Sequence, residues 1–174
     1  MTDTVSPKMD NRLMQPLVAK IEALRAIYDG INRNDIRAAV VPLSEDIAWI
    51  EPAEYTGSAT CHGRANVEAH LTRARATWAE GSCEPEQFIA ARSNLDKVVV
   101  IIHVHVRLKT ETAFRDGRHA AVYTFRNGQA PELQITEMRI IDDPQQAIEW
   151  AKTADVTSRV PNERPLLDGV ASRF

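Results

Sequence analysis

The chain has few of the residues that mark several common protein classes. It has two cysteines, Cys61 and Cys83, and neither belongs to a C-x-x-C pair or a zinc-binding spacing, so the sequence indicates free thiols instead of a disulfide framework. Its longest apolar run, Val98 to Ile102, is too short to cross a bilayer, and its first residues lack the apolar segment of a secretory signal. We therefore expect a cytoplasmic protein with no membrane partner.

The chain also lacks an excess of basic charge. It has 21 lysines and arginines against 24 acidic residues, a formal net charge of -3, and its arginines are scattered. Such a chain has no positive field to attract phosphate backbones, so we expect no nucleic-acid partner. The G-x-G-x-x-G, P-loop, G-x-S-x-G and H-E-x-x-H motifs do not occur, which leaves nucleotide binding, serine hydrolysis and zinc proteolysis without support.

What the chain does have is enough apolar sequence for one domain. Its 174 residues are 44% hydrophobic, a size and composition that suit a single folded unit with a sizeable core. We predict a flexible leader over residues 1–11, one domain over residues 12–152, and a polar, proline-interrupted C-terminal tail over residues 153–174.

Hydrophobic periodicity predicts mainly helices in the first half of the chain and mainly strands in the second. The expected helices are Pro16 to Arg33 with proline in its first turn, a short one capped by Asn34 or Asp35 and ending by Val41, Arg64 to about Glu80 with Gly81 as its stop, and a last one from Asp143-Pro144. The expected strands are 47–51, 87–92, 98–109, 119–126 and 133–141, with turns at 94–96, Asp116-Gly117 and Asn127-Gly128. The short connections make these strands antiparallel neighbours.

This order of elements predicts an α+β fold. The N-terminal helices would pack in a curved mixed, mainly antiparallel β-sheet, which gives a cone. Its wide end would be apolar and concave, where a small molecule could bind.

Four segments, taken in order and spacing, resemble a known superfamily. They are Gly30 to Asp35, Asp46 to Pro52, Gly63 to Val67 and Met138 to Pro144, and they are similar to the nuclear transport factor 2-like superfamily, above all its SnoaL-like and ketosteroid-isomerase-like branches, over about residues 16–152. The resemblance implies a conical, cystatin-like fold, a homodimer, and a cofactor-independent hydrophobic pocket. Members of the superfamily include isomerases, epoxide hydrolases, polyketide cyclases, dehydratases and noncatalytic binding proteins, so a small hydrophobic or carbonyl-bearing ligand is expected, but no single reaction.

Glu51 is the candidate general base. It stands directly before Pro52, where the resemblance implies the acidic residue that moves a proton, and an apolar wall beside Trp49 would increase its basicity. His70, on the inner side of the third predicted helix, is expected to relay a proton with Glu51; a satisfied core histidine is the alternative. Tyr55 is expected at the pocket mouth, with a surface loop as the alternative.

Further apolar and aromatic side chains are expected to line the pocket: Trp49, Leu71, Trp78, Tyr123, Met138 and Ile140. Met138 and Ile140 fit the inward phase of their strand, which sends Arg139 outward. A register slip of one residue would exchange the two faces.

The chain departs from the isomerase branch at two positions. That branch uses a phenol on the first helix, where this sequence places Ile27 with Tyr28 one residue out of phase, and a protonated acid on the penultimate strand, where it has Ala121 or Val122. The departures disfavour steroid isomerisation. A noncatalytic ligand-binding or assembly domain of the same fold therefore stays open as the second function.

His103 and His105 suggest a metal hypothesis. They alternate along one predicted strand and share a face with Arg107, but two ligands do not complete a site, and the flanking sequence does not fit a cupin. We therefore favour a polar outer face or dimer surface, and expect no metal and no other cofactor. A metal-dependent enzyme using this histidine pair is the third alternative.

Overall fold

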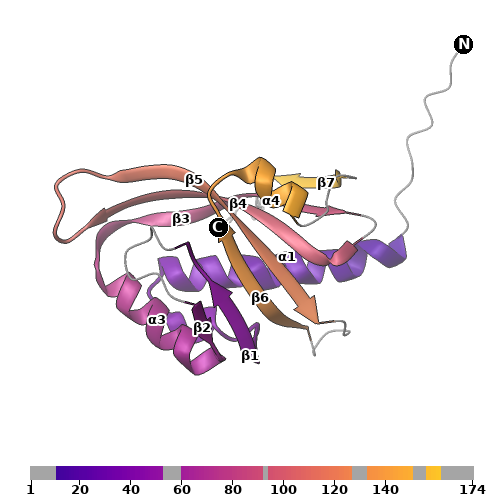
Figure 1. Cartoon of the computed structure of the whole chain (residues 1–174), viewed down its shortest axis with the longest axis horizontal. Coiled ribbons are helices and arrows are strands. Elements are labelled where there is room, and N and C mark those ends of the chain that lie inside the picture. Colours follow the sequence, from indigo (N-terminus) through magenta and orange to yellow (C-terminus); the bar gives the residue numbers. More distant parts are fainter. Residues whose placement is uncertain (1–10, 53–59, 92–93, 127–132, 151–155, 162–174) are drawn as a thin grey trace, which may run out of the picture.

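The chain folds as a curved seven-stranded sheet with helices on both faces, in a computed structural model that describes residues 11–52, 60–91, 94–126, 133–150 and 156–161 (Figure 1). Its helices are α1 (Asn11–Asn32), α2 (Ile36–Ala39), α3 (Arg64–Ala76) and α4 (Pro144–Trp150). Its strands are β1 (Leu43–Ile50), β2 (Thr60–His62), β3 (Trp78–Ala91), β4 (Asn94–Leu108), β5 (Arg115–Arg126), β6 (Gln134–Ile141) and β7 (Val156–Pro161). Among the described residues, no helix is both long and apolar enough to cross a membrane.

The sheet is mixed and mainly antiparallel, which confirms the predicted α+β class. Its strand order is β2-β1-β6-β5-β4-β3-β7. β1 and β6 run parallel, and each of the other neighbouring pairs is antiparallel. The parallel pair brings the strand that carries Trp49 next to a strand from the end of the predicted domain.

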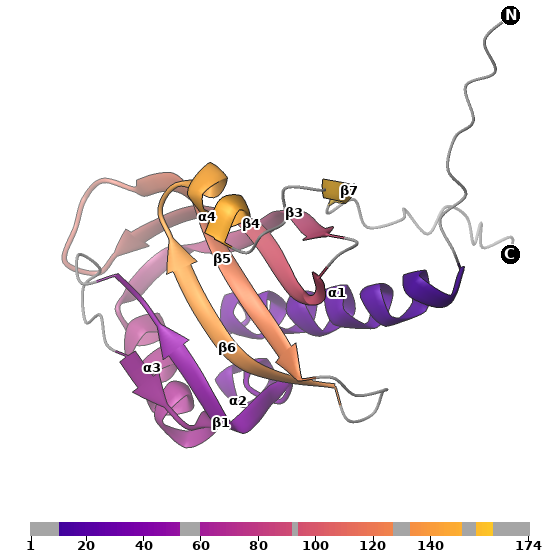
Figure 2. The ribbon, with the colours of Figure 1, turned by 45° about the vertical axis from the view of Figure 1, so that its right-hand side comes forward.

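The alternation of side chains divides the core between the two faces of the sheet. Val98, Val100 and Ile102 on β4 belong to the main core with Leu24 and other residues of α1. Val99 and Ile101 point the opposite way and pack with Ala147 of α4. Figures 1 and 2 show α1 along one face of the sheet and α4 on the other. We call these the inner and outer faces.

The first helix is longer than the sequence indicated. It begins at Asn11, so Pro16 lies inside α1 and the prediction that Pro16 occupies the first turn is wrong. Proline at this position removes the hydrogen bond that its N–H would make to residue 12, which lies close to the start of the helix. The predicted cap of the second helix is confirmed, since the Asp35 side chain accepts a hydrogen bond from the Ala38 N–H at 3.2 Å.

The third helix is shorter than predicted. It ends at Ala76, with Thr77 as its C-cap, so the expectation of a helix to Glu80 with Gly81 as its stop is wrong. Trp78 repeats the spacing of the helix's apolar residues, but it begins β3. Gly81 lies inside that strand with φ +112°, and a Cβ there would lie 2.1 Å from the carbonyl oxygen of His105 on β4. The glycine therefore serves the close approach of two strands.

Strands β1, β3, β4 and β5 begin before their predicted ranges because pairing continues into polar sequence, and the turn predicted at 94–96 is wrong because these residues begin β4. Asp116-Gly117, predicted as a turn, lies within β5, where Asp116 pairs with His105. Asn127-Gly128 lies outside the described residues. β2 was not predicted, and neither was β7, which pairs with the edge of β3 inside the predicted tail. A strand at the edge of a sheet pairs through its backbone N–H and C=O groups. A polar sequence can therefore form it without the apolar alternation by which strands are predicted.

Candidate active site

The candidate site lies where β1 ends beside α3. The Trp49 indole Nε1 donates a hydrogen bond to Glu51 Oε1 at 2.7 Å, and His70 Nε2 lies 3.1 Å from the same oxygen. The side chains of His70 and Glu51 are 7% and 12% exposed. Both contacts are made by Oε1, so the carboxylate is held in one orientation while Oε2 takes part in neither contact.

Two periodicities bring these side chains together. Alternation along β1 places Ile47 and Trp49 in the core, and Glu51 follows on the same side directly after the strand. On α3 the buried residues Val67, His70 and Leu71 occur at the spacing of one helical face, which packs against β1. His70 is thus both a buried core residue and a contact of Glu51.

Residues from three neighbouring strands form a row on the inner face. Trp49 pairs in register with Met138, and Met138 pairs with Tyr123. Their exposed fractions are 3%, 1% and 1%, so this row is deeply buried. Further along the strands, Ile140 pairs with Ala121, and both Ile140 and Glu51 are only half-buried. The solvent exposure of the inner-face side chains therefore rises from the row of Trp49, Met138 and Tyr123 toward Glu51.

A buried pair of phenols lies on the same face. The hydroxyls of Tyr28 on α1 and Tyr123 on β5 are 2.9 Å apart, and their rings meet edge to face with centroids 6.5 Å apart. Burial raises the pKa of both hydroxyls. Tyr123 raises the pKa of Tyr28 further, whereas the hydrogen bond with Tyr28 partly offsets the rise for Tyr123, to which Cys83 and the charge of Glu51 also contribute. The two phenols stay protonated at neutral pH, and because one hydroxyl hydrogen bridges the pair, the other is left to donate elsewhere.

The sequence interpretation missed the Tyr28 hydroxyl. Tyr28 lies on the same helical stripe as Ile21 and Leu24, so periodicity alone indicates only an apolar core residue, and the phenol position implied by the resemblance falls on Ile27. The missed signal is the hydroxyl itself, since a buried tyrosine usually needs a hydrogen-bond partner. Ile27 is fully buried in the core.

Replacing Tyr28 by phenylalanine is expected to lower the free energy of unfolding by about 1–3 kcal/mol, because the Tyr123 hydroxyl would stay buried without its partner. The double variant Tyr28→Phe/Tyr123→Phe should lose less than the sum of the two single variants, since it leaves no unpaired hydroxyl. Urea unfolding of the four proteins measures this coupling. Strictly additive losses would contradict it.

Cys83 joins the end of α1 to β3 near the phenol pair. Its N–H donates to Asn32 Oδ1 at 2.9 Å, and Asn32 Nδ2 donates to the Cys83 carbonyl at 3.0 Å. Burial raises the pKa of the Cys83 thiol to about 12, and burial together with the charge of Glu51 also raises the pKa of Cys61. The Cys83 thiol is therefore held neutral.

Alkylation of Cys83 in the folded protein is expected to be slower than in the unfolded chain by about three orders of magnitude at pH 8, because a thiol of pKa about 12 is almost entirely protonated. A Cys61→Ser background leaves Cys83 as the one thiol, and iodoacetamide labelling with and without denaturant measures the ratio. The raised pKa stabilises the fold below about pH 9, and this contribution is lost as the pH rises toward 12. Equal labelling rates would contradict the prediction.

The other predicted site residues fall in different places. Leu71, Tyr123 and Met138 are buried on the inner side, and Ile140 packs at its border. Trp78 lies on β3 and not on α3, half-buried beneath the Arg75 guanidinium at 4.8 Å from the ring centre. Tyr55 lies outside the described residues. His103 and His105 lie on the outer face, away from this site.

The chain is similar to known proteins in sequence and in fold. A family model described as the SnoaL-like domain matches residues 24–133. No curated protein matches the chain. Of the solved structures, TerC co-crystallised with polyporic acid is 24% identical over 79% of this chain and 98% of its own, with a TM-score of 0.59.

Two further structures have the same fold. An NTF2-like protein from Burkholderia xenovorans is 25% identical over 79% of this chain and 95% of its own, with a TM-score of 0.54. A protein from Catenulispora acidiphila with a ketosteroid isomerase-like fold, in complex with trimethylamine, is 14% identical over 75% and 92%, with a TM-score of 0.59. The family match over more than half of the sequence, together with this shared nuclear transport factor 2-like fold, shows that the chain belongs to the SnoaL-like domain family.

Proposed function

We propose that the chain binds a small hydrophobic or carbonyl-bearing molecule between the inner face of the sheet and helices α1 and α3, and that Glu51 takes a proton from it. The observation that carries the proposal is the cluster of Trp49, Glu51 and His70, in which two buried side chains hold one oxygen of a half-buried carboxylate. A fixed carboxylate at the border of an apolar core is suited to general base catalysis.

The reaction class is proton transfer next to a carbonyl group. Glu51 Oε2 would take the proton as the carbon–hydrogen bond breaks, and the electron pair would move onto the carbonyl oxygen. Return of the proton to a different carbon completes an isomerisation, so no oxidant or cofactor is needed. His70 would hold the Glu51 carboxylate in position through its contact with Oε1.

The phenol pair supplies a candidate donor for the developing oxygen charge. The hydroxyls of Tyr28 and Tyr123 remain protonated, and the charge of Glu51 acts on Tyr123. A preorganised donor in a buried site stabilises an oxyanion more than water does. The pair would take the place of the acid that Ala121 cannot provide.

The mouth of the proposed pocket lies at the Glu51 end of the inner face, because exposure rises in that direction. Apolar contacts from Trp49, Met138 and Ile140 would hold the body of the ligand. The complexes of TerC with polyporic acid and of the Catenulispora acidiphila protein with trimethylamine support small-molecule binding by this fold. We extend the proposal to a homodimer, the assembly implied by the superfamily resemblance, and a monomeric mass in solution would contradict it.

A second function, ligand binding without catalysis, is favoured by one specific observation. The two phenols hydrogen-bond to each other, and Glu51 Oε1 is already engaged by two side chains. A site whose polar groups are already partly engaged with one another is also suited to holding an apolar ligand in place.

Screening and isotope exchange separate the two functions. Thermal-shift measurements against carbonyl-bearing compounds identify ligands, because a ligand that binds only the folded state raises the Tm. Proton NMR in D₂O then follows deuterium incorporation next to the carbonyl of each ligand. Exchange accelerated by the protein supports proton transfer, whereas stabilisation without exchange or conversion supports the binding function and excludes catalysis of these ligands.

A further inference from the structure

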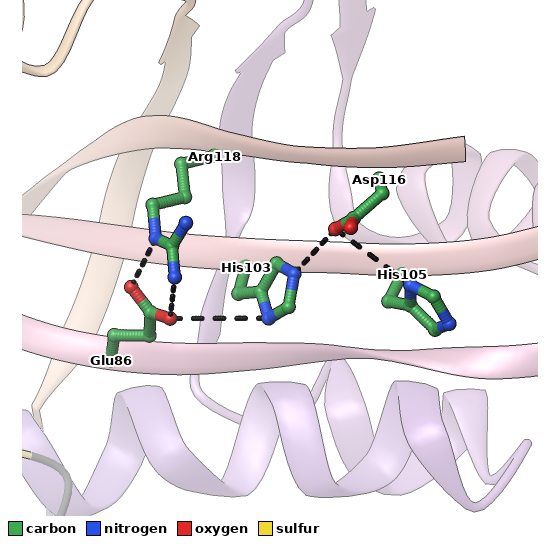
Figure 3. Close-up of polar contacts among 5 residues, drawn as sticks. All are labelled: Glu86, His103, His105, Asp116 and Arg118. Atoms are coloured by element: carbon green, nitrogen blue, oxygen red, sulfur yellow. Dashed lines mark hydrogen bonds and ion pairs between the residues drawn. The ribbon is translucent and has the colours of Figure 1, made fainter. Parts of the chain in front are cut away.

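A second cluster of polar side chains lies on the outer face of the sheet (Figure 3). His103 and His105 alternate along β4, and Asp116 on β5 pairs in register with His105. They share the face of Val99 and Ile101, but His103 is only half-buried, and His105 and Asp116 are exposed. The cluster is thus open to ions from solution.

Three atoms that can bind a metal converge in this cluster. His103 Nε2 lies 2.6 Å from Asp116 Oδ1, and His105 Nδ1 lies 3.7 Å from the same oxygen. One ligand atom from each residue lies within 4.8 Å of the others. Ligands on one tetrahedral zinc ion, at bond lengths of about 2.0–2.1 Å, lie about 3.3 Å apart, so small side-chain rotations bring all three into range.

The second ring nitrogen of His103 also faces a carboxylate. His103 Nδ1 lies 3.9 Å from Glu86 Oε1 on β3 while its Nε2 faces Asp116. Arg118 holds both Glu86 oxygens, at 2.8 and 2.9 Å. Metal-bound histidines usually present their other nitrogen to such a carboxylate, which fixes the tautomer and the ring orientation. Glu86 is therefore placed to orient His103.

The ring of His105 is also oriented. It stacks on Phe114, with ring centroids 4.3 Å apart and planes 11° apart. Phe114 is a large hydrophobic residue that is exposed, and its ring packs against that of His105. Each histidine therefore lies beside a side chain that is not itself a proposed ligand, Glu86 for His103 and Phe114 for His105.

We propose that His103, His105 and Asp116 bind a divalent transition-metal cation of the zinc class, with water completing its coordination. Two imidazoles and one carboxylate favour Zn²⁺ over Mg²⁺ and Ca²⁺, which prefer oxygen ligands. Asp116 and Glu86 carry two negative charges and Arg118 neutralises one, so the group attracts a cation. The ion would join β4 to β5 near the connection between them, independently of Glu51.

Titration of the full-length, untagged protein tests this site directly. Calorimetry with ZnCl₂ should show one ion per chain, and CoCl₂ should produce the visible absorption bands of a low-coordinate Co²⁺ site. At about 100 times the Kd, Zn²⁺ should raise the Tm by about 5–10 °C. Absence of stoichiometric binding by the wild-type protein would overturn the proposal.

Four variants with a matched control locate the ion. His103→Gln, His105→Gln and Asp116→Asn should each weaken Zn²⁺ binding at least about tenfold, and Glu86→Gln, which removes the orienting carboxylate and its ion pair with Arg118, about 10- to 100-fold. His119→Gln changes a histidine of β5 that contacts Asp142 instead, and it should bind as the wild type does. Unchanged affinity in His103→Gln, or an equal loss in His119→Gln, would overturn the assignment.

Discussion

Replacing Gly81 by alanine is expected to lower the free energy of unfolding by about 3–5 kcal/mol, the sum of backbone strain and forced overlap. Its φ of +112° is one that side-chain-bearing residues rarely adopt. The added Cβ would lie 2.1 Å from the His105 carbonyl oxygen and 2.6 Å from the Val106 Cα. These are backbone atoms of the paired strand, so no side-chain rotation relieves the contact.

Urea unfolding followed by circular dichroism measures the loss of unfolding free energy in Gly81→Ala, and thermal unfolding should show a fall in Tm of about 10 °C or more. Gly117→Ala is the matched control on β5. A Cβ there would have the His119 ring nitrogen as its nearest neighbour, at 3.9 Å, which is an ordinary contact. Its effect should stay within about 0.5 kcal/mol. Similar losses in both variants would show that the close approach at Gly81 does not govern stability.

Replacing Glu51 by glutamine is expected to slow protein-catalysed proton exchange about 10²- to 10⁴-fold and to change ligand affinity little. Glutamine has nearly the same shape, and its carbonyl oxygen still accepts the Trp49 hydrogen bond, so the apolar surroundings of the site persist. The amide lacks the negative charge and the basic oxygen that receive a proton. The loss should therefore fall on the rate and not on the Kd.

Deuterium incorporation and calorimetry on the same ligand measure the two quantities separately. Glu45→Gln is the matched control, since Glu45 lies on the same strand, is exposed, and pairs with Arg64 at 3.1 Å. It should leave both quantities unchanged. An exchange rate that survives in Glu51→Gln would exclude Glu51 as the base, and a parallel loss of binding would assign it to ligand recognition instead.

Sequence patterns predicted the features that depend only on residues close together in the chain. The stripe of α1, the Asp35 cap and the alternation of β1 depend on neighbours three or four residues away, or two, and all three occur in the structure. The end of α3 could not be predicted in this way. Trp78 continues the helical spacing, but the pairing of Gly81 with Val106 on β4 takes that segment into the sheet.

The candidate site depends on contacts that no local pattern contains. The sequence predicts that His70 acts together with Glu51, but their contact through Oε1 requires α3 to lie against β1, which no local pattern shows. The contact between Tyr28 and Tyr123 joins the first helix to the fifth strand. Asp116 was assigned to a turn, so its approach to His103 could not be foreseen. In each case the missing information is the register between distant strands or helices.

The parallel pairing of β1 with β6 also sets the order in which the molecule can be completed. β1 is synthesised early, but its neighbour in the sheet, which contributes Met138, is synthesised late. Closing so long a loop is entropically costly and slow, and it cannot begin before the ribosome has released most of the chain. During synthesis, the strand that ends beside Glu51 therefore gains its β6 neighbours only after most of the described chain has been made, so a chain truncated before β6 would lack the Met138 side of the proposed site.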